Sequence, residues 1–338
     1  MNETEARRVA ALAGEAVSGP DRSGWFDRLE SDRGALAEAV SWFLDRDDAD
    51  TALRIAVDVW RFWEQRGHLN EGRRIIGMAL ERGSRAQPGI RGRAYAAATA
   101  LAFRQGDNDT AASLVETALD LARAADDQRG ISSGLVWSAR VARRRGEPEV
   151  ARQRLEEAVA IAATLGDVRA MIEPLHSLAA GERLAGNYAE ARRRYEETRA
   201  LSEQIGNTRG AMIETMNLAA VALLAADVEA ADHGAKRALR WAGDTKDARA
   251  IPGCVSIVGG VGRLRGEPER AATLLGAAEA ALVRGQAAFD PDDSAEHAER
   301  VARAIELLGS DRYDQAADTG RAMTASDAVA LALDDQPR

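Results

Sequence analysis

A period of forty residues constrains the fold of this chain more than any other feature of its sequence. Turn-forming segments recur every forty residues, and an earlier one lies 39 residues before the first; they begin at Gly67, Gly106, Gly146, Gly186, Ala226 and Gly266. A second set of joints keeps the same step, at Asp127, Asp167, Asn207 and Asp247. Two turns per period leave two helices of about 16 residues each, so the sequence predicts an array of six helix pairs.

Small residues mark where the two helices of each pair meet. The first helix carries Thr99, Ala139, Ala179, Ala219 and Gly259, and an alanine follows twelve positions after each of them. This pattern resembles the tetratricopeptide repeat, in which two helix backbones approach closely at small residues, with about six additional residues per unit. We therefore expect an all-α fold: a right-handed α-solenoid of tetratricopeptide-like helix pairs with a forty-residue repeat and helical caps.

The two ends of the chain depart from the period. We expect an N-terminal helical cap at 1–45, six repeats at 46–288 and a C-terminal helical cap at 289–338. The N-terminal cap should hold helices at 4–18 and 25–44, and Trp60, in the small-residue column, should make the first pair pack differently. After a turn-rich break at 289–293, helices are expected near 294–309, 311–321 and 325–333, the last opened by a capping box at Thr324 and Asp327.

Charge and composition exclude several classes of function. The formal net charge is −9, so we expect neither direct DNA binding nor attachment to an anionic membrane. The longest strongly apolar run, 218–226, is far shorter than the roughly 20 residues of a membrane span, and Glu15 interrupts the N-terminal apolar stretch. These features predict a cytoplasmic protein. The only two lysines, Lys236 and Lys246, lack a G-K-[ST] context, which excludes a phosphate-binding P-loop.

Four segments go beyond generic repeat patterning: WFDRLE at 25–30, WRFWEQRGHLNEGRR at 60–74, AATLLGAAE at 271–279 and GRAMT at 320–324. Together they resemble the C-terminal helical region of bacterial transcriptional regulators of the LuxR/AfsR type, whose signal-transduction ATPases carry a tetratricopeptide-like tail. The resemblance implies an ATPase and a winged-helix domain upstream, in the same chain or in a partner. Ala317 departs from the family, which commonly has a tryptophan there. The resemblance leaves open whether the chain stands alone or is an excised domain of a larger regulator.

No residue pattern points to catalysis, a metal site or a cofactor. The four histidines are far apart in the sequence, and none has a HExxH or cysteine-rich context. Gly259, Gly260 and Gly262 lack the spacing of a dinucleotide-binding motif, so close helix packing is the favoured interpretation. No Ser/His/Asp or Cys/His arrangement is expected from the repeat register. We therefore predict a protein that is not an enzyme.

The candidate functional site is the concave wall formed by the first helix of each pair. Its thirty expected positions hold nine arginines and two acidic residues, and those of the fifth unit are apolar. The candidate ligand-binding residues are Arg61, Arg93, Arg104, Arg140, Arg143, Arg144, His176, Arg183, Met216, Leu223 and Arg263. Arginine matches the geometry of carboxylates and phosphates, which favours an acidic ligand with an apolar end. The alternative is that these arginines only extend over alanine-rich helices.

The sequence thus predicts a non-enzymatic helical-repeat module that binds a protein partner, an acidic peptide or a small effector in its concave groove. Its role would be that of a sensor or docking arm in a bacterial transcription-regulatory system. The alternatives are a stand-alone adaptor for acidic peptides and a small-molecule effector-binding domain. Arg143 and Arg183, forty residues apart, are expected side by side, so that replacing both with glutamine would leave folding intact or improve it slightly.

Overall fold

A computed structural model describes residues 1–18 and 22–334, and every regular element within these ranges is an α-helix. The helices are α1 (Glu3–Ser18), α2 (Arg22–Ser31), α3 (Arg33–Leu44), α4 (Ala49–Asp58), α5 (Trp60–Arg66), α6 (Leu69–Arg82), α7 (Pro88–Arg104), α8 (Asn108–Ala124), α9 (Gln128–Arg144), α10 (Pro148–Thr164), α11 (Val168–Leu184), α12 (Tyr188–Gln204), α13 (Thr208–Leu224), α14 (Val228–Asp244), α15 (Ala250–Leu264), α16 (Pro268–Gly285), α17 (Pro291–Leu308), α18 (Ser310–Arg321) and α19 (Ala325–Leu333). Within these ranges, no helix has both the length and the apolar character required to cross a membrane.

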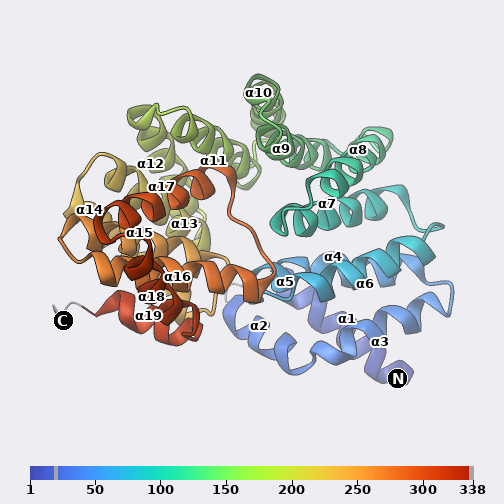
Figure 1. The fold of residues 1–338 in the computed structure, drawn as a ribbon. Coiled ribbons are helices and arrows are strands. Elements are labelled where there is room, and N and C mark those ends of the chain that lie inside the picture. Colours follow the sequence, from blue (N-terminus) through green and yellow to red (C-terminus); the bar gives the residue numbers. More distant parts are fainter. Residues whose placement is uncertain (19–21, 335–338) are drawn as a thin grey trace.

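The predicted right-handed solenoid of tetratricopeptide-like helix pairs is confirmed (Figure 1). Each pair consists of a first helix, called A, and a second helix, called B, and consecutive pairs stack from α7/α8 to α15/α16. The turn glycines adopt the left-handed conformation that ends a helix, as Gly186 does with φ of +80°, and Ala226 adopts it in the fifth unit with φ of +57°. At the second set of joints the Asp127 and Asn207 side chains accept hydrogen bonds from backbone N–H groups of the following helix.

Close contact within the pairs occurs at the predicted small residues. Ala179 and Ala191 are completely buried, and a Cβ atom on Gly259 would lie 3.3 Å from the carbonyl oxygen of Ala271. The first pair packs differently, as expected, because its A helix is broken at Val59 into α4 and α5. The tryptophan nearest to Gly72 is Trp63 rather than Trp60, the one singled out from the sequence.

The N-terminal cap contains three helices rather than the expected two, because the segment predicted as one helix at 25–44 is interrupted at Asp32. Its carboxylate pairs with Arg8 at 2.8 Å, which ties the junction to α1. The interruption allows α1 to contact both α2 and α3. A continuous helix could not fold back over α1 in this way.

The C-terminal helices lie where they were predicted, including the capping box formed by Thr324 and Asp327. Helix α18 packs along α16 at very short range, because Gly276 faces the backbone of Ala317 and Gly320 faces the carbonyl oxygen of Thr273. Ala317 itself is completely buried in the core that includes Leu275 and Tyr313. Residues 335–338 of the predicted cap lie outside the described residues.

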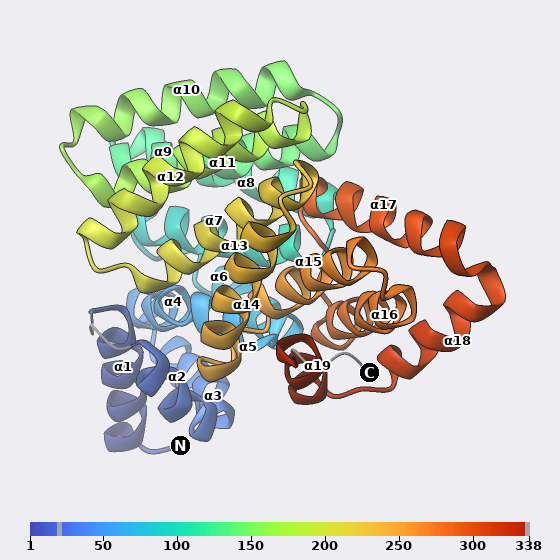
Figure 2. The same cartoon turned by 90° about the vertical axis from the view of Figure 1, so that its left-hand side faces the viewer.

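The superhelix curves until its first two units meet its last two. The carbonyl oxygen of Gln65, at the end of α5, accepts a hydrogen bond of 2.7 Å from Ala248 N, and that of Arg104, at the end of α7, accepts one of 2.7 Å from Ala288 N. Each bond satisfies a carbonyl at a helix end that has no partner within its own helix. Figures 1 and 2 show the blue α5 next to the orange α16, although more than 200 positions separate them in the sequence.

Candidate functional site

The arginines predicted on the concave wall lie on the inner side of this closed superhelix, but they do not form an open positive trough. Arg104, Arg140, Arg143 and Arg183 are all buried, with at most 8% of each residue exposed. The charges of Arg104, Arg140 and Arg183 are compensated by carboxylates of the same chain. Most of these carboxylates belong to residues 288–296, hereafter the acidic segment, which joins α16 to the first turns of α17.

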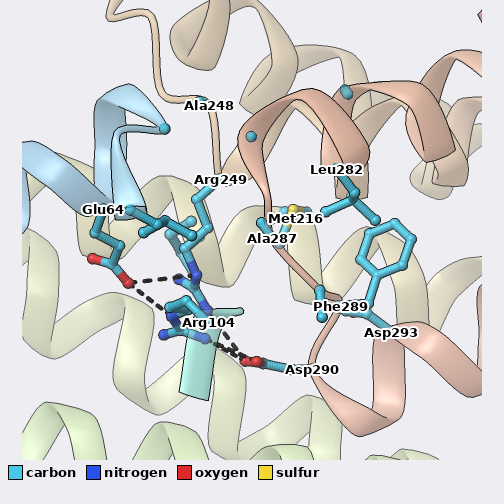
Figure 3. Close-up of a pocket in the computed structure, with 17 residues that line it drawn as sticks. Glu64, Arg104, Met216, Ala248, Arg249, Leu282, Ala287, Phe289, Asp290 and Asp293 are labelled. Carbon is cyan, nitrogen blue, oxygen red and sulfur yellow. Dashed lines mark hydrogen bonds and ion pairs between the residues drawn. The ribbon is translucent and has the colours of Figure 1, made fainter. Parts of the chain in front are cut away.

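Arg104 lies at the centre of a buried charge cluster (Figure 3). Its Nε donates to Glu64 Oε1 at 2.8 Å, and its Nη1 donates to both carboxylate oxygens of Asp290, at 2.8 and 2.9 Å. Arg249 pairs with the same two acids, at 3.7 Å from Glu64 and 3.2 Å from Asp290. Burial alone would raise the pKa of Glu64 and of Asp290, but the Arg104 and Arg249 guanidinium groups hold both values well below the usual range. The four side chains are therefore all charged, and each arginine pairs with both acids.

Arg144 binds the backbone of the acidic segment. Its Nη2 donates to the carbonyl oxygen of Phe289 at 3.0 Å and lies 3.6 Å from Asp290. Its guanidinium also stacks 3.7 Å from the centroid of the Phe103 ring. An arginine on α9 thus recognises both the main chain and a carboxylate of this segment.

Arg183, on α11, binds the other end of the acidic segment. Only 1% of its side chain is exposed, and it pairs with Asp292 at 3.4 Å, Asp293 at 2.5 Å and Glu296 at 2.5 Å. Its Nη1 also donates to Asn217 on α13. Arg183 is therefore a cation surrounded by three carboxylates rather than a neighbour repelled by Arg143. These ion pairs argue against the expectation that replacing Arg143 and Arg183 with glutamine would leave folding intact.

The remaining arginines of the third unit connect A helices to one another. Arg140 Nε donates to Ser177 Oγ at 3.1 Å and its guanidinium stacks on Trp137, and burial lowers its pKa to about 10 despite attraction to Glu173. Arg143 Nη1 donates to the carbonyl oxygen of Ser177 at 2.9 Å. These two arginines bridge α9 to α11 inside the groove, so the interpretation that they only extend over alanine-rich helices is wrong.

The other predicted residues occupy varied environments. Arg61 pairs with Glu173 at 3.4 Å, and His176 Nδ1 lies 2.9 Å from Glu214. Arg93 is exposed on α7 and Arg263 half-buried on α15; within the described residues, neither forms an ion pair or hydrogen bond with the acidic segment. The structure therefore brings Arg104, Arg144 and Arg183 together around this segment and leaves Arg93 and Arg263 outside that set.

The apolar wall predicted in the fifth unit is largely covered by α15. Met216 packs beside Gly253, and Leu223 packs beside Gly260, where an added Cβ would lie 2.6 Å from Leu223 Cδ2. The glycines of this helix thus serve close helix packing, as expected from the sequence. Met216 also lines a small cavity of about 50 Å³ next to Arg104 and Phe289 (Figure 3).

The sequence-based interpretation counted Glu64 among the two acidic residues of the concave wall but missed its pairing with Arg104. It also missed Arg249 and the four carboxylates of the acidic segment. One signal was available, because the break after the sixth unit carries Asp290, Asp292 and Asp293 within four residues. It was interpreted as a turn, since nothing in a local pattern shows that the turn points into the groove. Within the described residues, no group of three or more His, Cys, Asp or Glu side chains is arranged to hold a metal ion.

The fold also brings together a serine, a histidine and a glutamate that the repeat register did not predict. Ser256 Oγ lies 2.8 Å from His297 Nδ1, and His297 Nε2 lies 3.5 Å from Glu279. However, Ser256 is 1% exposed and its hydroxyl also accepts a hydrogen bond of 3.0 Å from Arg300. An occupied, inaccessible hydroxyl cannot attack a substrate. The contact instead fixes α17 to α15.

Comparison with known proteins finds similarity to this chain in fold alone. No protein-family model matches the chain, and no curated protein matches it. A Rap protein solved in complex with Competence and Sporulation Factor is 13% identical with a TM-score of 0.60, over 93% of this chain and 86% of that one. The apo form of RapI is 12% identical with a TM-score of 0.57, over 88% of this chain and 99% of that one.

A third solved structure is a STAND protein with a tetratricopeptide repeat sensor from Pyrococcus horikoshii. It is 19% identical with a TM-score of 0.49, and the alignment covers 81% of this chain and 43% of that one. These identities are low, and what the similar structures share with this chain is the tetratricopeptide-like helical-repeat architecture.

Proposed function

We propose that this chain is a non-enzymatic docking module that binds an acidic segment of a protein partner in its concave groove. The observation that carries the proposal is that Arg104, Arg144 and Arg183 already hold an acidic stretch of polypeptide there. Arg144 and Arg104 contact the Phe289 carbonyl and the Asp290 carboxylate near one end of this stretch, and Arg183 contacts the Asp293 carboxylate towards the other. A row of buried guanidinium groups at these spacings suits a peptide with several carboxylates.

The dimensions of the site favour a peptide over a small effector. With the acidic segment in place, the cavity beside Arg104 encloses about 50 Å³, below the roughly 300–1,000 Å³ that is usual for a small-molecule pocket. The contacts of the acidic segment extend instead from α7 to α11. An extended acidic ligand is therefore favoured over both a compact effector and an enzyme substrate.

We propose further that this module serves as the sensor or docking arm of a bacterial transcription-regulatory system. Support comes from the sequence resemblance to LuxR/AfsR-type regulators, which implies an ATPase and winged-helix region in the same chain or in a partner. In this proposal the repeats at 46–288 bind the ligand and the flanking segments at 1–45 and 289–338 act as caps. The adaptor alternative uses the same groove without any tie to transcription.

Fluorescence anisotropy tests the docking function directly. A labelled peptide with the sequence of residues 286–298 is titrated with the full chain, and an otherwise identical peptide with Asn and Gln in place of Asp and Glu is the control. We expect saturable binding of the acidic peptide alone, weakened by salt. If the acidic peptide binds no form of the chain, not even a variant in which the groove has been vacated, the proposal is refuted.

The regulatory setting is tested separately by co-purification with the protein encoded immediately upstream. Capture of an ATPase with a winged-helix region supports the sensor arm. Capture of proteins that lack a winged-helix region and bind through their acidic tails supports the alternative, a stand-alone adaptor.

A further inference from the structure

We infer that the acidic segment, residues 288–296, is an internal competitor that occupies the ligand site, and that the external ligand shares its chemistry. That ligand would be a peptide with an aromatic residue followed by carboxylates at the spacing of Asp290, Asp293 and Glu296. The inference rests on the proposed function and adds its specificity and its regulation. Binding in trans would require the acidic segment to leave the groove.

The first line of support is that the acidic segment uses the groove residues themselves. Arg104 donates to Asp290, and Arg144 donates to the Phe289 carbonyl. Arg183 donates to Asp293 and Glu296. An external acidic peptide bound to the same arginines cannot coexist with these contacts. The two are therefore mutually exclusive by geometry.

The second line of support is that the acidic segment matches the ligand predicted for this groove from the sequence. That ligand has an acidic part for the arginines and an apolar part for the fifth unit. Phe289 lies beside the same small cavity as Met216, while the adjacent Asp290 pairs with Arg104 (Figure 3). The segment supplies both parts in consecutive residues.

The third line of support is that the acidic segment is held by polar contacts and lies outside the apolar core. In the part of the chain that the structure describes, no apolar side chain between Ala280 and Ala304 is fully buried. Beyond this stretch, Ala304 and Leu308 join the core that includes Leu275 of α16. The segment is thus anchored at both ends by apolar packing, while its middle is attached by charge, as expected of a contact that can open.

Tethering makes this internal contact strong enough to regulate binding. A covalently attached segment competes at a high effective concentration, so the apparent affinity for an external peptide falls by the fraction of molecules whose groove is free. If about one molecule in ten to one in a hundred is open, release of the segment should tighten binding by about 10- to 100-fold.

A released variant tests this prediction while leaving the groove arginines intact. Asp293→Asn combined with Glu296→Gln weakens the hold of Arg183 on the segment and leaves Asp292 to compensate its charge. The matched control, Glu299→Gln with Glu306→Gln, removes the same charge from exposed positions of α17 that face Arg303. The probe is the labelled peptide of residues 286–298, and circular dichroism checks that each variant is folded.

A reversible lock provides a second test that does not depend on the released variant. A Cβ on Gly106 would lie 3.5 Å from Ala288 Cβ, within the range that a disulfide spans, so Gly106→Cys with Ala288→Cys can tie the segment to the end of α7. The natural Cys254 is buried and burial raises the pKa of its thiol, so it will not compete. The reduced form of the same protein is the control, and any strain at Gly106 is present in both forms.

The expected result is that the released variant binds the peptide at least about tenfold more tightly than the wild type and the matched control. Oxidation of the locked variant should abolish binding, and reduction should restore it. Equal, saturable binding by wild type, released variant and both forms of the lock would overturn the internal competitor but leave the docking function standing. An absence of binding by the released variant and by the reduced lock would overturn both.

Discussion

Arg183 offers the sharpest test of how the concave groove is stabilised. Its side chain is 1% exposed, and it compensates the charges of Asp292, Asp293 and Glu296. Replacing it with glutamine leaves these carboxylates in the interior without their shared cation. Removing one partner of a buried ion pair costs about 3–5 kcal/mol.

The structure places the expected loss at the lower end of that range. Glu296 keeps a second partner, Arg300, at 2.7 Å, and 26% of the Asp293 side chain is exposed, so water can solvate part of the released charge. We therefore expect Arg183→Gln to lower the free energy of unfolding by about 3 kcal/mol. With an m-value of about 3 kcal/mol per M, the urea midpoint falls by about 1 M.

The assay is urea unfolding followed by circular dichroism, with Arg193→Gln as the matched control. Arg193 pairs with Glu190 and Glu197 on the surface of α12 and is 60% exposed, so its loss should change the free energy of unfolding far less than the loss of Arg183. Adding Asp293→Asn to Arg183→Gln should recover part of the loss, because one uncompensated charge is removed. If Arg183→Gln is as stable as Arg193→Gln, Arg183 does not stabilise the fold by compensating the buried carboxylates.

Three further predictions concern the register, the charge cluster and the absence of nucleotide chemistry. Ala191→Leu should overpack the buried contact with Ala179 and destabilise the chain by about 1–3 kcal/mol, and an unchanged melting temperature would refute the register. Because the folded-state pKa values of Glu64 and Asp290 lie below their ordinary values, their contribution to stability is present above about pH 4 and is lost as the pH falls further. The contribution of Asp292 to stability changes with pH in the opposite sense, because burial raises its pKa. The urea midpoints measured from pH 7 to pH 3 should nevertheless fall overall, and a flat profile would contradict the roles given to Glu64 and Asp290. Finally, the purified chain should not hydrolyse Mg-ATP, and turnover that follows the protein through successive columns would overturn the proposal that it is not an enzyme.

The repeat architecture could be predicted from the sequence because its causes are local. A left-handed turn at Gly186, a helix cap at Asn207 and a small residue at Ala191 act on neighbours within one or two helices. Their forty-residue spacing therefore predicts the pairs and their stacking. The N-terminal cap has no such period, and its third helix was missed.

The state of the groove was decided by the tertiary structure. Arginine spacing placed Arg104, Arg144 and Arg183 on one wall, but it carried no information on what faces them. Glu64 meets Arg104 from the neighbouring repeat, but Arg249 and Asp290 reach this pair only because the accumulated curvature of the units brings the first two repeats against the last two. That curvature is a sum of small rotations between neighbours, which no local pattern determines. A wall predicted to be open and positive is for this reason closed and charge-compensated by the chain itself.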